Sequence, residues 1–237
     1  MCGIVAAFEF KDSEKIRTQV LEMSKKIRHR GPDWTGIYSS KKAILAHERL
    51  SIVDPESGKQ PLYSKNKELI LAANGEIYNH KSLRQILLNR GHTFKTSSDT
   101  ESILNGYAEW GFKVVNHLRG MFSFGIWDSK KNLLFLARDR LGIKPLYIYE
   151  KNNELIYSSE IASILDIYDS DFDEFGLRQY RKLRMTLKGY TIYKDIKQFP
   201  AGSYSINSKI TKYWDINPER TDDPSDEKLD FLLNLKK

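Results

Sequence analysis

The chain has 237 residues, which is enough for one large domain or two small ones. Apolar residues make up 40% of the sequence and there are 14 glycines, a proportion that excludes an intrinsically disordered chain. The net charge is +7, but no long basic run occurs, so the composition argues against a nucleic-acid-binding protein.

The cysteine content and the N-terminal residues indicate the compartment. Cys2 is the single cysteine, so no internal disulfide forms, as is typical of a reducing compartment. The first residues lack the basic start and the long apolar stretch of a signal peptide, and no run is long enough to cross a membrane. We therefore expect a cytoplasmic protein without a membrane segment.

Short apolar runs bounded by turn residues predict strands along most of the chain. The first run, residues 2–10, predicts a buried strand at the N-terminus. Further strands are expected at residues 44–46, 69–73, 121–127, 133–137, 146–149 and 155–157.

Four helices are expected between these strands. Apolar residues at helical spacing define the first, behind Ser13 as its candidate N-cap. The second ends at Gly91, and the third opens at a capping box over 98–101 and ends at Gly111. The fourth runs over 174–185. Helices that arrive singly among antiparallel hairpins indicate an α+β fold whose sheets are covered by helices.

The composition changes near residue 215. Residues 215–225 are polar and contain two prolines, which is typical of a linker, and residues 226–237 open a further helical pattern with three leucines. We therefore expect one domain over 1–215, followed over 216–237 by a linker and the start of a truncated or absent second domain.

Cys2 is the first candidate catalytic residue. Removal of Met1 is expected because a small residue follows it, and Cys2 would then carry the free α-amine. That amine has a reference pKa of about 7.7–8 and can accept the thiol proton without a histidine partner. The alternative is a small buried cysteine in a core strand.

Two charged residues are candidates for binding a small polar molecule. Arg49 follows an apolar strand, where its guanidinium can bind a carboxylate through two parallel hydrogen bonds or instead pair with Glu48 or Asp54. Asp99 lies at the start of the third predicted helix, where the helix dipole favours the ionised carboxylate. It can bind an ammonium group there or cap the helix.

The dipeptide Asn74-Gly75 lies between strand-like runs and has two interpretations. It is a strong signal for a hairpin turn. Alternatively, an asparagine amide beside a glycine N–H supplies two donors for an oxyanion. No two histidines are closer than 12 residues, and no glycine-rich phosphate loop occurs, so neither a metal site nor a nucleotide site is expected in this chain.

Ordered motifs along residues 1–215 together carry a family resemblance. They are MCGI at 1–4, RHRGPD at 28–33, HERLSIVD at 47–54, QPL at 60–62, NGEIYN at 74–79, SDTE at 98–101, GMFSF at 120–124 and RDRLGIKPLY at 138–147. The series resembles the class II glutamine amidotransferase domain, with its nearest likeness in the N-terminal half of glutamine-hydrolysing asparagine synthetase.

The resemblance implies a fold and a reaction. The fold would be a four-layer αββα sandwich of two mainly antiparallel sheets, of the N-terminal-nucleophile (Ntn) hydrolase type. Cys2 would attack the side-chain amide of L-glutamine, form a glutamyl thioester and release ammonia, and water would then yield glutamate. Asn74 and Gly75 would stabilise the oxyanion, and the 28–33 loop would act as a lid.

The resemblance also implies the substrate-binding residues. Arg49 would bind the α-carboxylate of glutamine, while Glu76 and Asp99 would bind its α-ammonium group. The backbone at Ile52 and Val53 would line the amide end of the pocket.

The sequence departs from complete asparagine synthetases in one respect. Those proteins continue into a second domain with an S-G-G-x-D-S nucleotide loop, which these 237 residues lack. The ammonia is therefore expected to serve a separate or missing synthetase domain, and ATP and magnesium are expected only there. The alternatives are a catalytically idle glutamine-binding module that docks to a synthetase subunit, and an ammonia donor to a sugar or peptide carboxylate. A homodimer is also allowed.

Overall fold

The computed structural model describes residues 1–151 and 154–216, and within them the strands form two antiparallel six-stranded sheets. Sheet A contains, in spatial order, β10 (Ile196–Gln198), β8 (Tyr147–Lys151), β9 (Glu154–Ser158), β1 (Gly3–Phe8), β3 (Ala43–Arg49) and β2 (Trp34–Ser39). Sheet B contains β12 (Lys209–Lys212), β11 (Ser203–Ile206), β7 (Leu133–Arg138), β6 (Gly120–Asp128), β5 (Leu69–Ile77) and β4 (Leu62–Tyr63).

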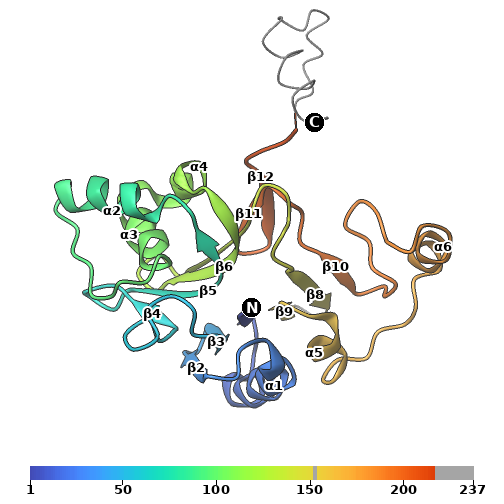
Figure 1. Cartoon of the computed structure of the whole chain (residues 1–237). Helices are drawn as coiled ribbons and strands as arrows, with labels where there is room; N and C mark the ends of the chain where they lie inside the picture. Colours follow the sequence, from blue (N-terminus) through green and yellow to red (C-terminus); the bar gives the residue numbers. More distant parts are fainter. Residues whose placement is uncertain (152–153, 217–237) are drawn as a thin grey trace, which may run out of the picture.

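Helices cover the outer face of each sheet (Figure 1). Sheet A is covered by α1 (Ser13–Lys26) and α5 (Ile161–Leu165), and sheet B by α2 (His80–Asn89), α3 (Glu101–Trp110) and α4 (Val114–His117). Two short 3₁₀ turns, η1 (Arg28–Arg30) and η2 (Gly111–Lys113), extend the ends of α1 and α3, and α6 (Glu174–Leu183) stands to one side of the layers. The order is therefore the four-layer αββα sandwich that the resemblance implies.

Strand β1 illustrates why both faces of the sheets are apolar. Ile4, Ala6 and Phe8 belong to the apolar layer between the two sheets, whereas Val5 and Ala7 pack with α1 in the outer layer. Successive residues of a strand point to opposite faces, so a strand buried on both faces needs an uninterrupted apolar run. This is the reason that residues 2–10 were recognisable as a core strand.

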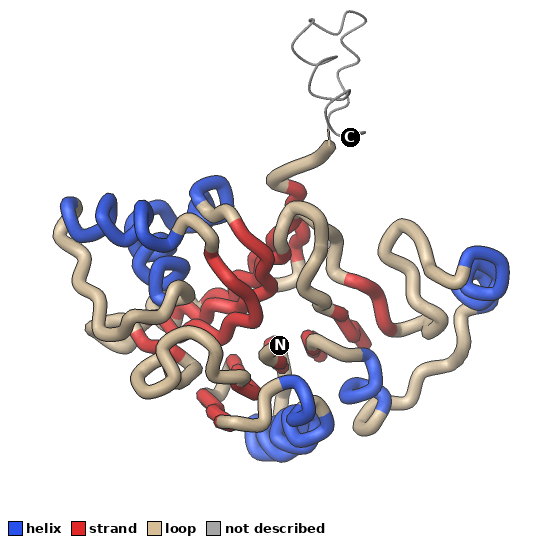
Figure 2. The backbone as a smooth tube through the Cα atoms, in the orientation of Figure 1, coloured by secondary structure: helices blue, strands red, loops and turns tan. Residues whose placement is uncertain are grey.

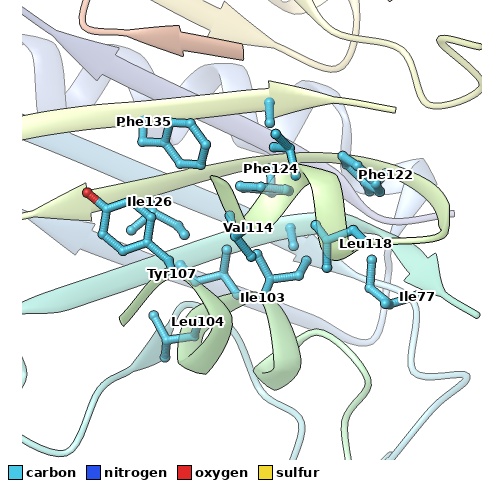
Figure 3. Packing of buried hydrophobic residues seen from close by; sticks show 14 of the residues in the cluster. Ile77, Ile103, Leu104, Tyr107, Val114, Leu118, Phe122, Phe124, Ile126 and Phe135 are labelled. Carbon is cyan, nitrogen blue, oxygen red and sulfur yellow. The ribbon is translucent and has the colours of Figure 1, made fainter. Parts of the chain in front are cut away.

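The outer layer over sheet B is built around aromatic side chains (Figure 3). The ring of Phe135 lies 5.4 Å from that of Tyr107 and 5.8 Å from that of Phe124, measured between centroids. Contacts of this kind contribute roughly 0.5–1.5 kcal/mol each beyond the burial of area. The first contact attaches α3 to β7, and the second joins β7 to β6.

Both predicted helix N-caps were wrong. The first helix is capped by Asp12, not Ser13: its carboxylate accepts hydrogen bonds from two backbone N–H groups of the first turn, each at 3.0 Å. The third helix has no capping box, because the carboxylate of Glu101 instead accepts the N–H groups of Lys95 and Thr96, both at 2.8 Å. The predicted end of that helix is confirmed, since Gly111 follows it with a positive φ of 58°.

Asn74-Gly75 is not a hairpin turn. Both residues lie inside β5, where they pair with Ser123 and Phe122 of β6. A Cβ on Gly75 would lie 2.3 Å from the carbonyl oxygen of Met121, so the glycine is required by the close approach of β6. The turn interpretation of this dipeptide was therefore wrong.

The predicted helical pattern over 226–237 lies outside the described residues. Within 1–151 and 154–216, none of the helices combines the length and the apolar character needed to cross a membrane.

Candidate active site

The polar residues singled out from the sequence meet in one cleft at the edge of the layer between the two sheets. The cleft is lined by Cys2, Arg49, Ile52, Val53, Asn74, Gly75, Glu76 and Asp99, together with Met1, Leu50, Gly58, Gln60, Ala73, Ser98, Thr100 and Lys144. Figure 2 shows the N-terminus at the centre of the molecule, among the strands. All eight predicted site residues are therefore brought together.

The alternation of strand residues explains why these side chains meet. Cys2 lies two residues before Ile4, and Asn74 lies two residues after Ala72, and both Ile4 and Ala72 belong to the inter-sheet layer. Residues two apart on a strand share a face. The stripe that is apolar along most of each strand thus becomes polar at this edge, with Cys2 contributed by sheet A and Asn74 by sheet B.

The thiol of Cys2 is held beside the backbone of Leu50. The N–H of Leu50 donates to Sγ at 3.4 Å, and Sγ lies 3.7 Å from the carbonyl oxygen of the same residue. Burial raises the pKa of the Cys2 thiol, although the Leu50 N–H, the chain's amino group, Arg49 and Lys144 each act to lower it. The resting thiol is therefore protonated at neutral pH and needs a base to react as a thiolate.

The segment 28–33 is attached to the strands that carry Cys2 and Arg49. The guanidinium of Arg30 donates to the carbonyl oxygen of Cys2 at 3.0 Å and to the carboxylate of Glu160 at 2.7 Å. The N–H of Asp33 donates to the carbonyl oxygen of Arg49 at 3.0 Å. In this structure the segment braces the cleft, and a role as a lid stays a prediction.

The guanidinium of Arg49 is buried and organises the loop that follows β3. It donates to the carbonyl oxygens of Val53 and Pro55, each at 3.0 Å, and to that of Asp54. Within the described residues it forms no salt bridge with Glu48 or Asp54, so the ion-pair alternative is not realised. A guanidinium has five N–H groups, and these bonds leave some of them for a ligand.

The amide of Asn74 is an unused donor. Its Nδ2 atom is buried and has no hydrogen-bond partner among the described residues. Buried polar groups are nearly always paired, and an exception calls for a functional explanation. Beside it, Gly75 lines the same cleft. The pair offers donors to an oxygen that carries negative charge.

Two carboxylates lie in the same cleft as Asn74. Asp99 is buried, and its Oδ2 accepts the N–H of Ile77 at 2.6 Å. Burial raises the pKa of Asp99, while the Ile77 N–H and the nearby His80 act to lower it. Glu76 is half-buried. The cleft thus combines cationic Arg49 with two acidic groups, a set suited to an amino acid.

Comparison with known proteins agrees with this geometry. Residues 1–214 match the family described as "Glutamine amidotransferase domain". The chain belongs to this family. It is 42% identical to "Asparagine synthetase B [glutamine-hydrolyzing]" of Escherichia coli over 90% of this chain and 35% of that protein. It is 36% identical to "Asparagine synthetase [glutamine-hydrolyzing] 3" of Bacillus subtilis over 99% of this chain and 40% of that protein.

The chain therefore spans about a third to two fifths of the length of these curated relatives. Among solved structures, a glutamine phosphoribosylpyrophosphate amidotransferase from B. subtilis superposes with a TM-score of 0.66 at 20% identity, over 90% of this chain and 49% of that one. At that identity the likeness concerns the fold alone, and it supports the two-sheet sandwich of the amidotransferase domain.

Several residues of the amidotransferase cleft were missed by sequence reasoning. Gln60 and Lys144 line it, and His47 lies buried beneath it. Each belongs to one of the quoted motifs, but no pattern in the sequence gives it a role. Within residues 1–151 and 154–216, no group of histidine, cysteine and acidic side chains is arranged to hold a metal ion.

His47 makes the stability of the amidotransferase domain depend on pH. Its Nε2 donates to the carbonyl oxygen of Ala73 at 2.9 Å, so the proton is on Nε2 and Nδ1 is left buried without a partner in the described structure. Burial, aided by the charge of Arg49, lowers the pKa of His47 from 6.5 to about 4. Between these values the unfolded chain binds the extra proton more readily than the folded one.

We expect the contribution of neutral His47 to be complete above pH 6.5 and to be lost as the pH falls to 4. It should amount to about 2–3 kcal/mol between pH 7.5 and pH 4.5. Urea denaturation at both pH values measures it. In His47→Gln, which keeps a donor but does not titrate, this part of the pH dependence should disappear. An equal loss of stability in both proteins would contradict the assignment.

Proposed function

We propose that this domain hydrolyses L-glutamine to glutamate and ammonia through a thioester on Cys2. The observation that carries the proposal is the buried Nδ2 of Asn74, which has no hydrogen-bond partner among the described residues and lines the same cleft as the thiol. A donor held open without a partner is what an oxyanion site requires, because the charge to be stabilised exists only during the reaction.

The enzyme is active only after Met1 has been removed. The freed α-amine of Cys2 accepts the thiol proton, and the thiolate attacks the amide carbon of glutamine. A C–S bond forms, and the electron pair of the C=O bond moves to oxygen, where Asn74 Nδ2 and the N–H of Gly75 bind it. The C–N bond then breaks, and the protonated amine gives its proton to the leaving nitrogen, which departs as ammonia.

The second half of the reaction restores the enzyme. Water attacks the thioester carbon, with the α-amine of Cys2 as the base, and the same two donors bind the oxyanion. The C–S bond breaks as the C=O bond re-forms, the thiolate takes up a proton from the amine, and the new carboxyl group loses its proton to water as glutamate leaves. No cofactor is needed for either half, because the amine and the thiol supply the base and the nucleophile.

The substrate is oriented by its two charged groups. Arg49 binds the α-carboxylate with the N–H groups that are not used by the 53–55 loop. Glu76 and Asp99 bind the α-ammonium group, and the backbone at Ile52 and Val53 lines the amide end. Buried ionic partners of this kind fix a ligand in one orientation.

The relatives suggest the use of the ammonia. Their names describe asparagine synthetases that hydrolyse glutamine, and this chain matches one part of each. We propose that residues 1–215 are the glutaminase domain, and that the ammonia passes to an amide-forming synthetase domain outside these 237 residues. Residues 216–237 would lead toward that domain.

Cys2→Ala should abolish the release of ammonia from glutamine, because no other thiol exists in the chain. The assay uses protein whose mass establishes that Met1 is absent, and calorimetry should find that the variant still binds glutamine. Undiminished ammonia release by the variant would refute the thioester mechanism. Wild-type protein that binds glutamine without releasing ammonia would instead indicate the idle docking module.

Asn74→Ala and Arg49→Ala should affect different kinetic constants. Loss of one oxyanion donor lowers kcat by roughly 10²–10³-fold, because that bond strengthens only in the transition state. Loss of the carboxylate partner should raise KM more than it lowers kcat, because the ground state and the transition state use it alike. Asn89→Ala and Arg178→Ala, both exposed, are the matched controls. A KM effect alone in Asn74→Ala would contradict its role.

A further inference from the structure

The side chain of Gln60 binds the backbone of Ala73 at two points. Its Nε2 donates to the carbonyl oxygen of Ala73 at 3.1 Å, and its Oε1 accepts the N–H of Ala73 at 2.7 Å. Strand β4 pairs with β5 only at Leu62 with Leu71 and at Tyr63 with Ile70. Beyond that short ladder, the amide of Gln60 takes the place of the next backbone partner.

Gln60 is itself fixed to the opposite sheet. It is 6% exposed, and its carbonyl oxygen accepts the indole N–H of Trp34, on β2 of sheet A, at 3.2 Å. The same carbonyl packs against β2 so closely that a Cβ on Gly36 would lie 2.0 Å from it. Gln60 therefore joins sheet A, through its backbone, to sheet B, through its side chain.

His47 makes a second bond between the sheets at the same atom. It lies on β3, and its Nε2 donates to the carbonyl oxygen of Ala73 at 2.9 Å. That oxygen therefore accepts two N–H groups, one from each residue. Strand β3 also pairs directly with β1, where His47 lies opposite Ile4, two residues from Cys2.

These bonds end one residue before Asn74. Asn74 Nδ2 has no hydrogen-bond partner in the described structure, so the donor is not held in place by a hydrogen bond of its own. The position of Asn74 relative to Cys2 depends on how β5 sits against sheet A. At this polar end of the inter-sheet layer, Gln60 and His47 supply the hydrogen bonds that hold the two together.

We propose that Gln60 and His47 are positioning residues, which hold Ala73 and thereby align the Asn74 and Gly75 donors with the thiol of Cys2 across the two sheets. The inference rests on the proposed glutamine hydrolysis and adds two residues to it. Neither residue is assigned a contact with the reacting atoms. Misplacement of a reacting group by about 1 Å can cost a hundredfold in rate, so loss of this alignment should appear in kcat.

The first test compares Gln60→Met with Gln85→Met, an exposed glutamine on α2. Methionine keeps the length of the side chain and removes both hydrogen bonds. We expect kcat of Gln60→Met to fall about tenfold to a hundredfold, with KM for glutamine changed by less than about threefold. Gln85→Met should behave as wild type. If Gln60 only stabilises the fold, the melting temperature falls and kcat of the folded enzyme does not.

The second test uses Gln60→Glu, whose kcat should depend on pH in a way that a purely structural role of Gln60 would not produce. An ionised carboxylate at position 60 would still accept the N–H of Ala73 but has no proton to donate to the carbonyl oxygen of Ala73. A protonated carboxyl group can do both, so it restores the two hydrogen bonds of Gln60. The charged groups that line the same cleft as Gln60 are Arg49, Lys144, Glu76 and Asp99, and the titratable His47 bonds the same carbonyl oxygen of Ala73. We expect the ratio of variant to wild-type kcat to rise as the pH is lowered from about 8 to about 5.5.

The outcomes are distinguishable. Wild-type kcat and KM in Gln60→Met, or a ratio for Gln60→Glu that does not change with pH, would overturn the inference and leave the proposed hydrolysis intact. If Gln60→Met does not fold, the ratio for Gln60→Glu decides. A wild-type enzyme that releases no ammonia would overturn the proposed function, and the inference with it.

His47→Gln, which keeps the donor, should retain more activity than His47→Leu, and equal activity of the two would remove His47 from the proposal.

Discussion

The contact between β1 and β3 of one sheet and β5 of the other decides where every reactive group lies. Along most of its area this contact is apolar, formed by alternate residues such as Ile4, Leu45 and Ala72. Where the apolar stripe ends, the same alternation presents Cys2, Arg49 and Asn74. The site is therefore the polar edge of a core layer, and its geometry is determined by strand register and by the distance between the sheets.

A buried thiol is a poor nucleophile unless a base is close by, and in the proposed mechanism the α-amine of Cys2 is that base. Burial raises the pKa of Cys2, and within the described residues no histidine lies in the cleft lining to accept its proton. A cysteine at the start of the mature chain carries its own amine, which titrates near neutral pH. The backbone of Leu50 and the guanidinium of Arg30 then hold the first residue in place, where a chain end would otherwise be free to move.

The sequence predicted the inner part of the fold better than its edges. The long inner strands contain continuous apolar runs, and each of the predicted runs corresponds to a strand of the structure. The outer strands β2, β4, β10 and β12 were not predicted, nor was β11. The outer strands are short or only partly buried, so they need no apolar run; all four residues of β12, for example, are exposed.

For the site, residue chemistry alone gave five of the eight predicted residues as candidates, each with an alternative: Cys2, Arg49, Asn74, Gly75 and Asp99. The resemblance decided between the alternatives and added Ile52, Val53 and Glu76. Asn74-Gly75 looked like a turn because the pair is common there, yet the glycine is present because β6 passes too close for a side chain. Gln60 and His47 were not recognised as site residues, because the shared partner of their side chains is a backbone carbonyl, that of Ala73 on β5. Contacts between backbone and side chain across distant segments leave no periodicity in the sequence.

In the proposed mechanism, a chain beginning at Cys2 forms a covalent bond to its substrate through that residue. Intact-mass spectrometry of protein quenched during glutamine turnover tests it most directly. We expect a chain without Met1, of which a fraction carries one glutamyl group that peptide mapping places on Cys2. Ammonia release by a chain that keeps Met1, or a glutamyl group on any other residue, would contradict it.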